Sequence, residues 1–116
     1  MLIYGEINTM NSGKRWTVYD RYSNNIYLTH ERWQHITDNH PEMSDYEESL
    51  KKTILQGHRK QDPLNMRKYR YVKTFDNLAA DNTHIVAVVL FGVSVGDSGE
   101  LIPNNYIVTA YQKEIG

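Results

Sequence analysis

The chain has 116 residues, the length of one domain that can bury a core without disulfides or bound metals. It has no cysteine, which excludes disulfides and thiolate metal sites, and its net charge of −1 argues against a general nucleic-acid binder. The start lacks the basic segment of a signal peptide, and the longest apolar run, 85–95, is too short to cross a bilayer as a helix. We therefore expect a single domain over residues 1–116, in the cytoplasm and without a membrane partner.

The charge is unevenly distributed along the chain. Residues 1–50 and 74–116 each carry −4, whereas residues 51–73 hold eight Lys or Arg against one Asp, a net charge of +7. Tyrosines lie among these cations, and a basic, aromatic strip suits contact with phosphates and unstacked bases. The candidate RNA contacts are Arg59, Lys60, Lys68, Tyr69, Arg70 and Tyr71. The alternative is a solvated helix face that leads into an exposed edge strand guarded by lysines.

The first residues of the chain predict strands. Leu2 to Thr9 can form one strand, and 16–28 is typical of a hairpin with its turn at Ser23-Asn-Asn25. The hairpin leads directly into the first helix.

Residues 30–39 are predicted to form a helix that carries two histidines. Thr29 is placed as its N-cap, and Pro41 ends it. His40 shares a face with the apolar side chains of the helix, whereas His35 points roughly the opposite way. The two histidines therefore leave one short helix in different directions.

A second helix is predicted to follow from a capping box and to stop near a glycine. Ser44 and Glu47 are three residues apart, as in a capping box, and Gly57 is a natural C′ residue. The segment His58–Pro63 is then expected to be a basic loop.

The second half of the chain predicts strands with a period of two. Met66–Phe75 alternates, 84–91 is apolar almost throughout as in a central strand covered on both faces, and Asn105–Lys113 is the last strand. Strict alternation in this last strand places Thr109 and Tyr111 on one face and Tyr106 on the other. The expected fold is α+β: an N-terminal hairpin and two helices followed by an antiparallel β-sheet of about four strands.

The reactive side chains offer chemistry that needs no metal. The three histidines His30, His35 and His40 are spaced by five, which spreads them around a helix, and no known metal-binding motif is present. What remains is a histidine, the basic residues Arg67, Lys68 and Lys73, and the pair Thr109 and Tyr111. RNA can be cleaved with such a set because its own 2′-hydroxyl is the nucleophile. Histidine suits the proton transfer, and Arg or Lys suits the developing phosphate charge.

Several of these residues together carry a resemblance to a known group of nucleases. Trp33-Gln-His-Ile36 with His40-Pro-Glu42, the basic Tyr-rich strand and Val108-Thr-Ala-Tyr111 resemble the barnase–EndoU–colicin–RelE-like nuclease superfamily, in its phage- and toxin-associated branch. The similarity covers roughly residues 16–114.

This resemblance implies a small metal-independent endoribonuclease without cofactors that leaves a 2′,3′-cyclic phosphate, with RNA as its substrate. An antitoxin or immunity protein is a further partner that the resemblance suggests. Carried over to this chain, the catalytic residues are His35 or His40, then Arg67 or Lys73, then Thr109 and Tyr111. Nothing in the sequence marks which basic residue fills the catalytic position.

Two other classes of function fit the same sequence. One is a non-catalytic module that binds RNA or a protein through the basic strip, and the other is a structural subunit with an exposed sheet edge. Each candidate also has a structural alternative: His40 can simply close its helix before Pro41, His35 can be solvated, and Thr109 and Tyr111 can be strand packing.

Overall fold

The structure, a computed structural model, describes residues 13–116, so the strand expected at Leu2 to Thr9 lies outside the described residues. The elements in chain order are β1 (Lys14–Tyr19), β2 (Asn25–Thr29), α2 (His30–Asn39), η1 (Pro41–Met43, a 3-10 turn), α3 (Glu47–Gln56), β3 (His58–Asp62), β4 (Asn65–Thr74), β5 (His84–Val95) and β6 (Leu101–Lys113). None of the helices in this range is long and apolar enough to cross a membrane.

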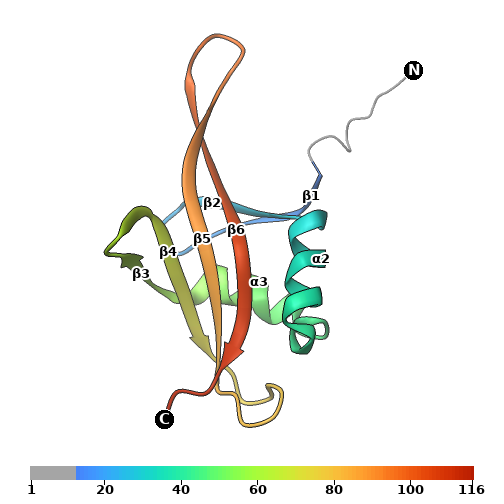
Figure 1. Cartoon of the computed structure of the whole chain (residues 1–116). Helices are drawn as coiled ribbons and strands as arrows, with labels where there is room; N and C mark the ends of the chain where they lie inside the picture. Colours follow the sequence, from blue (N-terminus) through green and yellow to red (C-terminus); the bar gives the residue numbers. More distant parts are fainter. Residues whose placement is uncertain (1–12) are drawn as a thin grey trace, which may run out of the picture.

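All six strands belong to one mixed sheet, in the order β1-β2-β6-β5-β4-β3 (Figure 1). The strands β3 to β6 form the antiparallel part, and the hairpin β1–β2 joins it through a short parallel pairing of β2 with β6. The predicted α+β fold, with a hairpin and two helices before a sheet, is therefore confirmed. The chain order did not reveal that the hairpin extends the same sheet.

Helix α2 begins and ends at the predicted residues. The backbone N–H of Arg32 donates to the Thr29 hydroxyl at 3.0 Å, which makes Thr29 the N-cap. The helix ends at Asn39, and Pro41 starts η1. The side chains of Trp33 and Ile36 are buried in the core.

The predicted capping box of α3 is wrong. The helix begins at Glu47 after Tyr46, which makes no side-chain cap, and Ser44 instead ends η1. Glu47 is engaged elsewhere: its carboxylate accepts the indole N–H of Trp16 at 2.9 Å and pairs with Arg15. This carboxylate therefore ties the start of α3 to β1 instead of capping the helix.

Helix α3 ends at Gly57, as predicted, but for a different reason. The residue is extended, with φ −70° and ψ 161°, and does not adopt the left-handed conformation of a C′ glycine. A Cβ atom here would lie 2.3 Å from the carbonyl oxygen of Thr53 and 2.9 Å from that of Val72. Glycine is required because the last turn of α3 and the backbone of β4 both approach so closely.

The basic segment after α3 is an edge strand, and its prediction as a loop is wrong. Residues 58–62 pair with β4 from His58 opposite Val72 to Asp62 opposite Asn65. The Asp62 carboxylate accepts the backbone N–H groups of Leu64 and Asn65, at 2.7 and 3.2 Å, and so closes the turn into β4. Charged side chains are common on exposed edge strands because they discourage further pairing.

Helix α3 covers one face of the sheet. Its buried side chains pack in one core cluster with inward residues of β4 and β5, among them Tyr71, Ile85 and Ala87. In Figure 1 α3 passes behind the sheet and α2 lies beside β6. Within residues 13–116 no helix lies over the opposite face, which we call the open face.

A β-bulge in β6 overturns the strict alternation predicted for the last strand. Val88 is opposite Thr109 and Val89 is opposite Ile107, so that Val108 is the extra residue. Before the bulge Ile107 points into the core, and after it Ala110 does. Tyr106 therefore lies on the same face as Thr109 and Tyr111.

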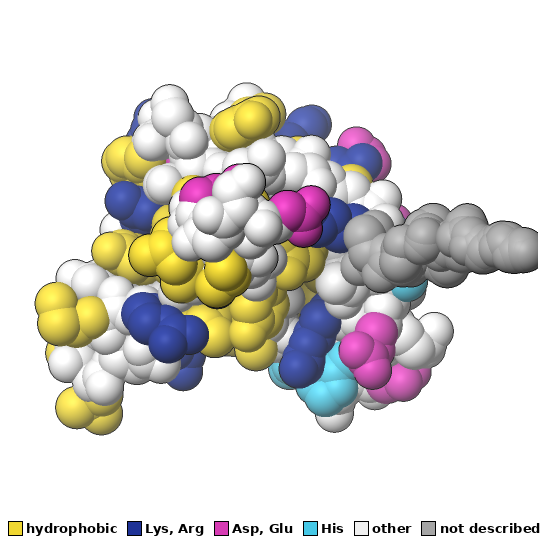
Figure 2. Space-filling view, turned by 90° about the horizontal axis from the view of Figure 1, so that it is seen from above, with side chains coloured by type: hydrophobic (Ala, Val, Ile, Leu, Met, Phe, Trp, Pro, Cys, Tyr) yellow, Lys and Arg dark blue, Asp and Glu magenta, His cyan; other side chains and the backbone are white. Residues whose placement is uncertain are grey.

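The far ends of β5 and β6 leave the sheet as a two-stranded arm, residues 91–104. Their pairing continues to Val95 opposite Leu101, beyond the last β4 partner, Lys68 opposite Leu90. Val93 is 63% exposed, and Val95 and Leu101 are each 70% exposed. Figure 2 looks down on this end of the molecule and shows hydrophobic side chains gathered beneath the acidic tip.

Candidate functional site: the open face of the sheet

The open face is built from three rows of side chains that run across the strands. Opposed residues in a sheet share a face, so the pairing defines each row. The first row is Tyr27, Tyr106, Leu90 and Lys68; the second is Thr109, Val88, Arg70 and Lys60; the third is Tyr111, Val86, Val72 and His58.

The centre of this face is apolar and its surroundings are polar. Val86 and Val88 are only 4% and 6% exposed although they lie outside the helix-facing core cluster. The half-buried side chains around them, such as Arg70, Thr109 and Tyr111, therefore shield them from solvent. The centre of the open face is therefore a buried apolar surface with hydroxyl and guanidinium groups beside it.

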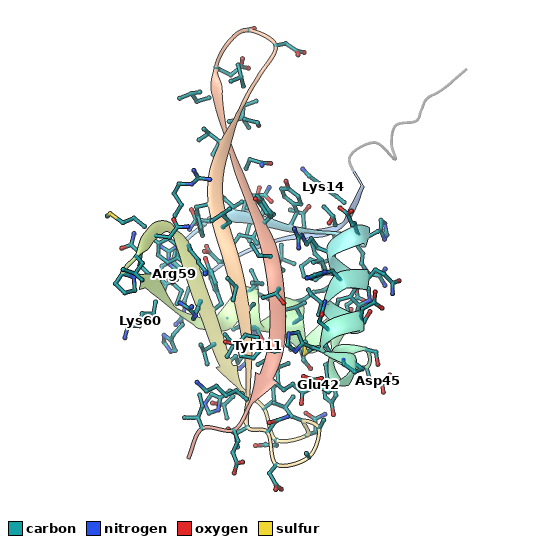
Figure 3. All side chains as sticks on the ribbon, viewed as in Figure 1. Lys14, Glu42, Asp45, Arg59, Lys60 and Tyr111 are labelled. Carbon is teal, nitrogen blue, oxygen red and sulfur yellow. The ribbon has the colours of Figure 1, made fainter. Side chains whose placement is uncertain are left out.

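His40 joins this face from the end of α2. Its ring centroid is 5.7 Å from that of Tyr111, with the planes tilted by 36°. The Nδ1 atom of His40 lies 3.8 Å from the Glu42 carboxylate, an ion pair when the imidazole is protonated. Figure 3 labels Tyr111 on β6 and Glu42 below α2. The structure therefore brings together an imidazole, a carboxylate and a phenol.

The next residue of β6 holds His40 and Glu42 in place. Gln112 points to the other face, where its amide N–H donates to the carbonyl oxygen of Glu42 at 3.2 Å. Its amide oxygen accepts the backbone N–H of Ala79 at 2.8 Å. Gln112 is 8% exposed, so this connection is shielded from water. Two successive residues of β6 thus contact the α2–η1 corner, one through its ring and one through its amide.

Arg70 is the nearer to Thr109 of the two basic residues in the second row, because Lys60 lies one strand further away. Two strand spacings separate the Cα atoms of Arg70 and Thr109, about 10 Å. The guanidinium of Arg70 lies 3.1 Å from the Asp62 carboxylate, and the Lys68 ammonium lies 3.9 Å from it. The backbone N–H of Leu64 first, and then Arg70, hold the pKa of Asp62 below its ordinary value despite some desolvation.

The two basic residues predicted for catalysis are not on this face. Arg67 donates its Nε–H to the carbonyl oxygen of Phe91 at 3.0 Å, at the base of the arm. Lys73 lies over the ring of Phe75, 5.4 Å from its centroid, in the row of the buried residue Ile85. The structure therefore brings neither of them together with His40 and Tyr111.

His35 is also separate from this group. It lies exposed on α2, and its contacts are with Asn39, whose amide donates to the His35 carbonyl oxygen at 2.9 Å and lies 3.4 Å from both ring nitrogens. Of the two histidines predicted as alternatives, His40 is the one beside Tyr111.

Three of the six predicted RNA contacts belong to a structural cluster instead. Tyr71 is completely buried, so its prediction as a base-stacking residue is wrong. The ring of Tyr69 packs 4.9 Å from that of Phe91, and the guanidinium of Arg59 lies 4.5 Å from the Tyr69 ring and 4.3 Å from the Tyr22 ring. Lys60, Lys68 and Arg70 remain on the open face.

The residue that anchors this cluster, Asp20, was not predicted as a functional or structural centre from the sequence. Burial alone would raise the pKa of its carboxyl, but hydrogen bonds from the Tyr71 hydroxyl, the Asn24 amide and the backbone N–H groups of Asn24 and Tyr22 lower it. Its position at the start of a turn was the available signal, because Asp there bonds to the backbone two residues later. Its long-range partner Tyr71 had no sequence signal.

Among residues 13–116, no three His, Asp or Glu side chains are grouped as they would be around a metal ion. The comparisons with known proteins give no relative from which a site could be transferred: no family model matches the chain, and neither a curated protein nor a solved structure is significantly similar to it. The side chains of the open face are therefore the evidence for function.

Proposed function

We propose that the protein is a small endoribonuclease of toxin or phage type that acts in the cytoplasm and cleaves RNA without a metal ion. The observation that carries the proposal is the contact of the His40 ring with Tyr111, two residues from Thr109, on an open face that also bears Lys60, Lys68 and Arg70. Imidazole, hydroxyl and guanidinium groups are sufficient for RNA transesterification, because the 2′-hydroxyl of the substrate supplies the nucleophile.

In the proposed reaction, His40 takes the proton of the 2′-hydroxyl as its oxygen bonds to phosphorus. The bond from phosphorus to the 5′-oxygen breaks, and the Tyr111 hydroxyl gives its proton to that leaving oxygen. The imidazolium then returns a proton to Tyr111. Glu42, 3.8 Å from Nδ1 of His40, stabilises the imidazolium while it exists. The products are a 2′,3′-cyclic phosphate and a free 5′-hydroxyl.

Thr109 and Arg70 would stabilise the phosphate. The Thr109 hydroxyl has no hydrogen-bond partner among the described residues, so it is available to a non-bridging oxygen. Arg70 would exchange its single hydrogen bond to Asp62 for a phosphate, which can accept two N–H groups of the guanidinium. Donors fixed in advance around a developing charge contribute more than mobile ones. The resemblance noted in the sequence implies the same reaction and leaves the basic residue open, and we propose Arg70 for that role.

The reaction is tested by incubating the purified protein with RNA in excess EDTA and identifying the ends of the products. We expect cleavage to persist and to leave 2′,3′-cyclic phosphate and 5′-hydroxyl ends. Activity that disappears with EDTA and returns with magnesium would contradict this mechanism, since a metal would then be supplying the nucleophile or the charge.

A non-catalytic RNA-binding module is the second candidate. The observation that favours it is that the cations of the open face lie mainly on β3 and β4, two strands away from His40. Such a face would bind phosphates whether or not His40 transfers protons. Salt-sensitive RNA binding by a wild-type protein that cleaves no RNA would support this candidate over the enzyme.

A further inference from the structure

A pocket of about 720 Å³ lies at the base of the arm, beside the first row of the open face. Its walls come from β4, β5, β6 and the turn between β1 and β2, and the residues that matter here are Arg67, Phe91, Gly92, Asn104, Asn105 and Tyr106. No aspartate or glutamate of the described chain lines it. The wall thus combines carboxamides, aromatic rings and one cation with the apolar side chains of Val93 and Pro103.

The aromatic edge of the pocket is fixed by a pair of tyrosines. The rings of Tyr106 and Tyr27 lie 6.0 Å apart with planes tilted by 37°. The Tyr27 hydroxyl donates to the side-chain oxygen of Asn104 at 2.9 Å. This bond orients the Asn104 carboxamide and leaves its N–H groups for another partner. Lys14 lies over the Tyr27 ring at 4.4 Å, which adds positive charge beside the pair (Figure 3).

The opposite side of the pocket holds Arg67 in a fixed position. Its Nε–H donates to the carbonyl oxygen of Phe91, while its two terminal nitrogens make no hydrogen bond within residues 13–116. Gly92 leaves the space in front of it open. A Cβ atom on Gly92 would lie 3.2 Å from the backbone oxygen of Asn104 and 3.9 Å from a terminal nitrogen of Arg67. A side chain at this position would therefore enter the space between Arg67 and Asn104.

We propose that this pocket binds a nucleobase of the RNA strand, with the base against Tyr106, its polar edge on the Asn104 amide and a flanking phosphate at Arg67. Aromatic rings stack on unpaired bases, carboxamides bond to base edges, and arginine binds phosphate. The bulge in β6 places Tyr106 and Thr109 on one face in neighbouring rows, so a strand cleaved at Thr109 would pass the pocket. The inference rests on the proposed function, because it takes RNA to be the ligand.

The test measures binding separately from cleavage. The His40→Ala protein is titrated with labelled homopolymeric tetranucleotides of A, C, G and U, alone and combined with Asn104→Ala, Tyr106→Leu or Gly92→Ala. We expect the His40→Ala protein to bind one of the four oligonucleotides most tightly. Each added change should weaken the affinity for that oligonucleotide by about tenfold and change the affinity for the other three little. Gly92→Ala is informative because it removes no polar group: its Cβ would narrow the pocket and press on the backbone oxygen of Asn104, 3.2 Å away.

Matched control variants remove the same kinds of side-chain group from positions outside the pocket. Asn77→Ala and Tyr19→Leu lose an exposed carboxamide and an exposed ring outside the pocket, and they should bind like the parent. All variants should have melting temperatures within a few degrees of that of the His40→Ala protein. Conclusions about the pocket are drawn only from the binding of variants that meet this criterion.

The outcomes separate this inference from the proposed function. Equal affinity for the four oligonucleotides, unchanged by the pocket variants, overturns the base pocket even if the wild type cleaves RNA. Base-dependent binding that the variants abolish supports the pocket, and it does so even if the wild type proves inactive and the nuclease proposal fails. A parent protein that binds no oligonucleotide overturns the base pocket as well.

Discussion

The hydroxyl of Tyr71 donates a 2.5 Å hydrogen bond to the carboxylate of Asp20, which joins the buried centre of the sheet to the turn of the N-terminal hairpin. Burial, and then the hydrogen bond to Asp20, raise the pKa of Tyr71 well above its ordinary value. The guanidinium of Arg59 lies 3.8 Å from the same carboxylate. This cluster fixes the hairpin against β4 on the side of the sheet opposite the open face.

Replacing Tyr71 with phenylalanine should destabilise the protein by about 1–3 kcal/mol, because one oxygen of the nearly buried Asp20 loses a hydrogen bond. Tyr69→Phe is the matched control, since the Tyr69 hydroxyl has no hydrogen bond within residues 13–116. Urea unfolding of the two variants gives the comparison. Equal unfolding free energies for both would contradict a stabilising role for the Tyr71–Asp20 bond.

The protein should lose stability in acid because three carboxyl groups, those of Asp20, Glu47 and Asp62, have lowered pKa values in the folded state. The hydrogen bond from Arg15 is the main cause that lowers the pKa of Glu47; burial opposes it, and a further bond from Trp16 adds to it. Burial alone would raise the pKa of Asp20, but the bonds from Tyr71 and Asn24 outweigh it. Such groups bind fewer protons when folded, so their stabilisation is complete above the ordinary pKa of about 4 and is lost as the pH falls below it.

We therefore expect the melting temperature to fall steeply below about pH 4, the ordinary pKa of a carboxyl group. Glu47→Gln should melt lower than the parent at pH 7 and should lose less on acidification, because the titrating group is gone. Glu48→Gln, at the neighbouring position where an exposed carboxylate lies 3.1 Å from the Lys51 ammonium, should follow the parent curve. A Glu47→Gln curve parallel to that of the parent would show that this carboxyl does not contribute to the acid transition.

Much of the fold could be predicted because local signals and packing agree. Thr29 before an amphipathic stretch, Pro41 after it and the apolar run from Ile85 each specify an element, and each element is found. Ser44 and Glu47 matched a capping box, but Glu47 binds Arg15 and Trp16, which lie more than thirty residues earlier in the chain. A local pattern cannot show a competing partner that is distant in sequence.

The candidate site was predictable only in part. The spacing of Thr109 and Tyr111 was sufficient to place them on one face, but the histidine and the basic residue depended on tertiary geometry. The choice between His35 and His40 depends on how α2 lies against β6, and Arg70 emerges only from the register of β4 against β5. The bulge at Val108 reversed the predicted side of Tyr106 without any sequence signal.

RNA binding should weaken steeply with salt. If about four phosphates are neutralised, the logarithm of the affinity should fall with a slope of roughly −3 against the logarithm of salt concentration. Lys68→Gln and Arg70→Gln should each reduce the magnitude of this slope by about 0.7. Lys52→Gln, an exposed cation on α3 across the sheet, should leave it unchanged. Identical slopes for all these proteins would exclude the open face as the phosphate-binding surface.

Thr109→Val should reduce the rate of cleavage while preserving the fold. The substitution keeps the β-branched shape of a half-buried strand residue and removes a hydroxyl that makes no hydrogen bond within the described chain. Loss of one donor to a developing oxyanion typically costs about 10² in rate. Thr17→Val, on the exposed strand β1, is the control for the same change in chemistry. A Thr109→Val protein as active as Thr17→Val would remove Thr109 from the mechanism.

The most direct test of the proposed mechanism compares the two histidines of one helix. Cleavage of a single RNA is followed in EDTA with the wild type, His40→Ala, His40→Gln and His35→Ala, each checked for its melting temperature. We predict that both His40 variants lose activity by about 10² to 10⁴, as expected for a general base, while His35→Ala cleaves like the wild type. The opposite result would contradict the assignment of the site to His40 and Tyr111. In that result His35→Ala loses its activity, whereas His40→Gln is folded and retains it.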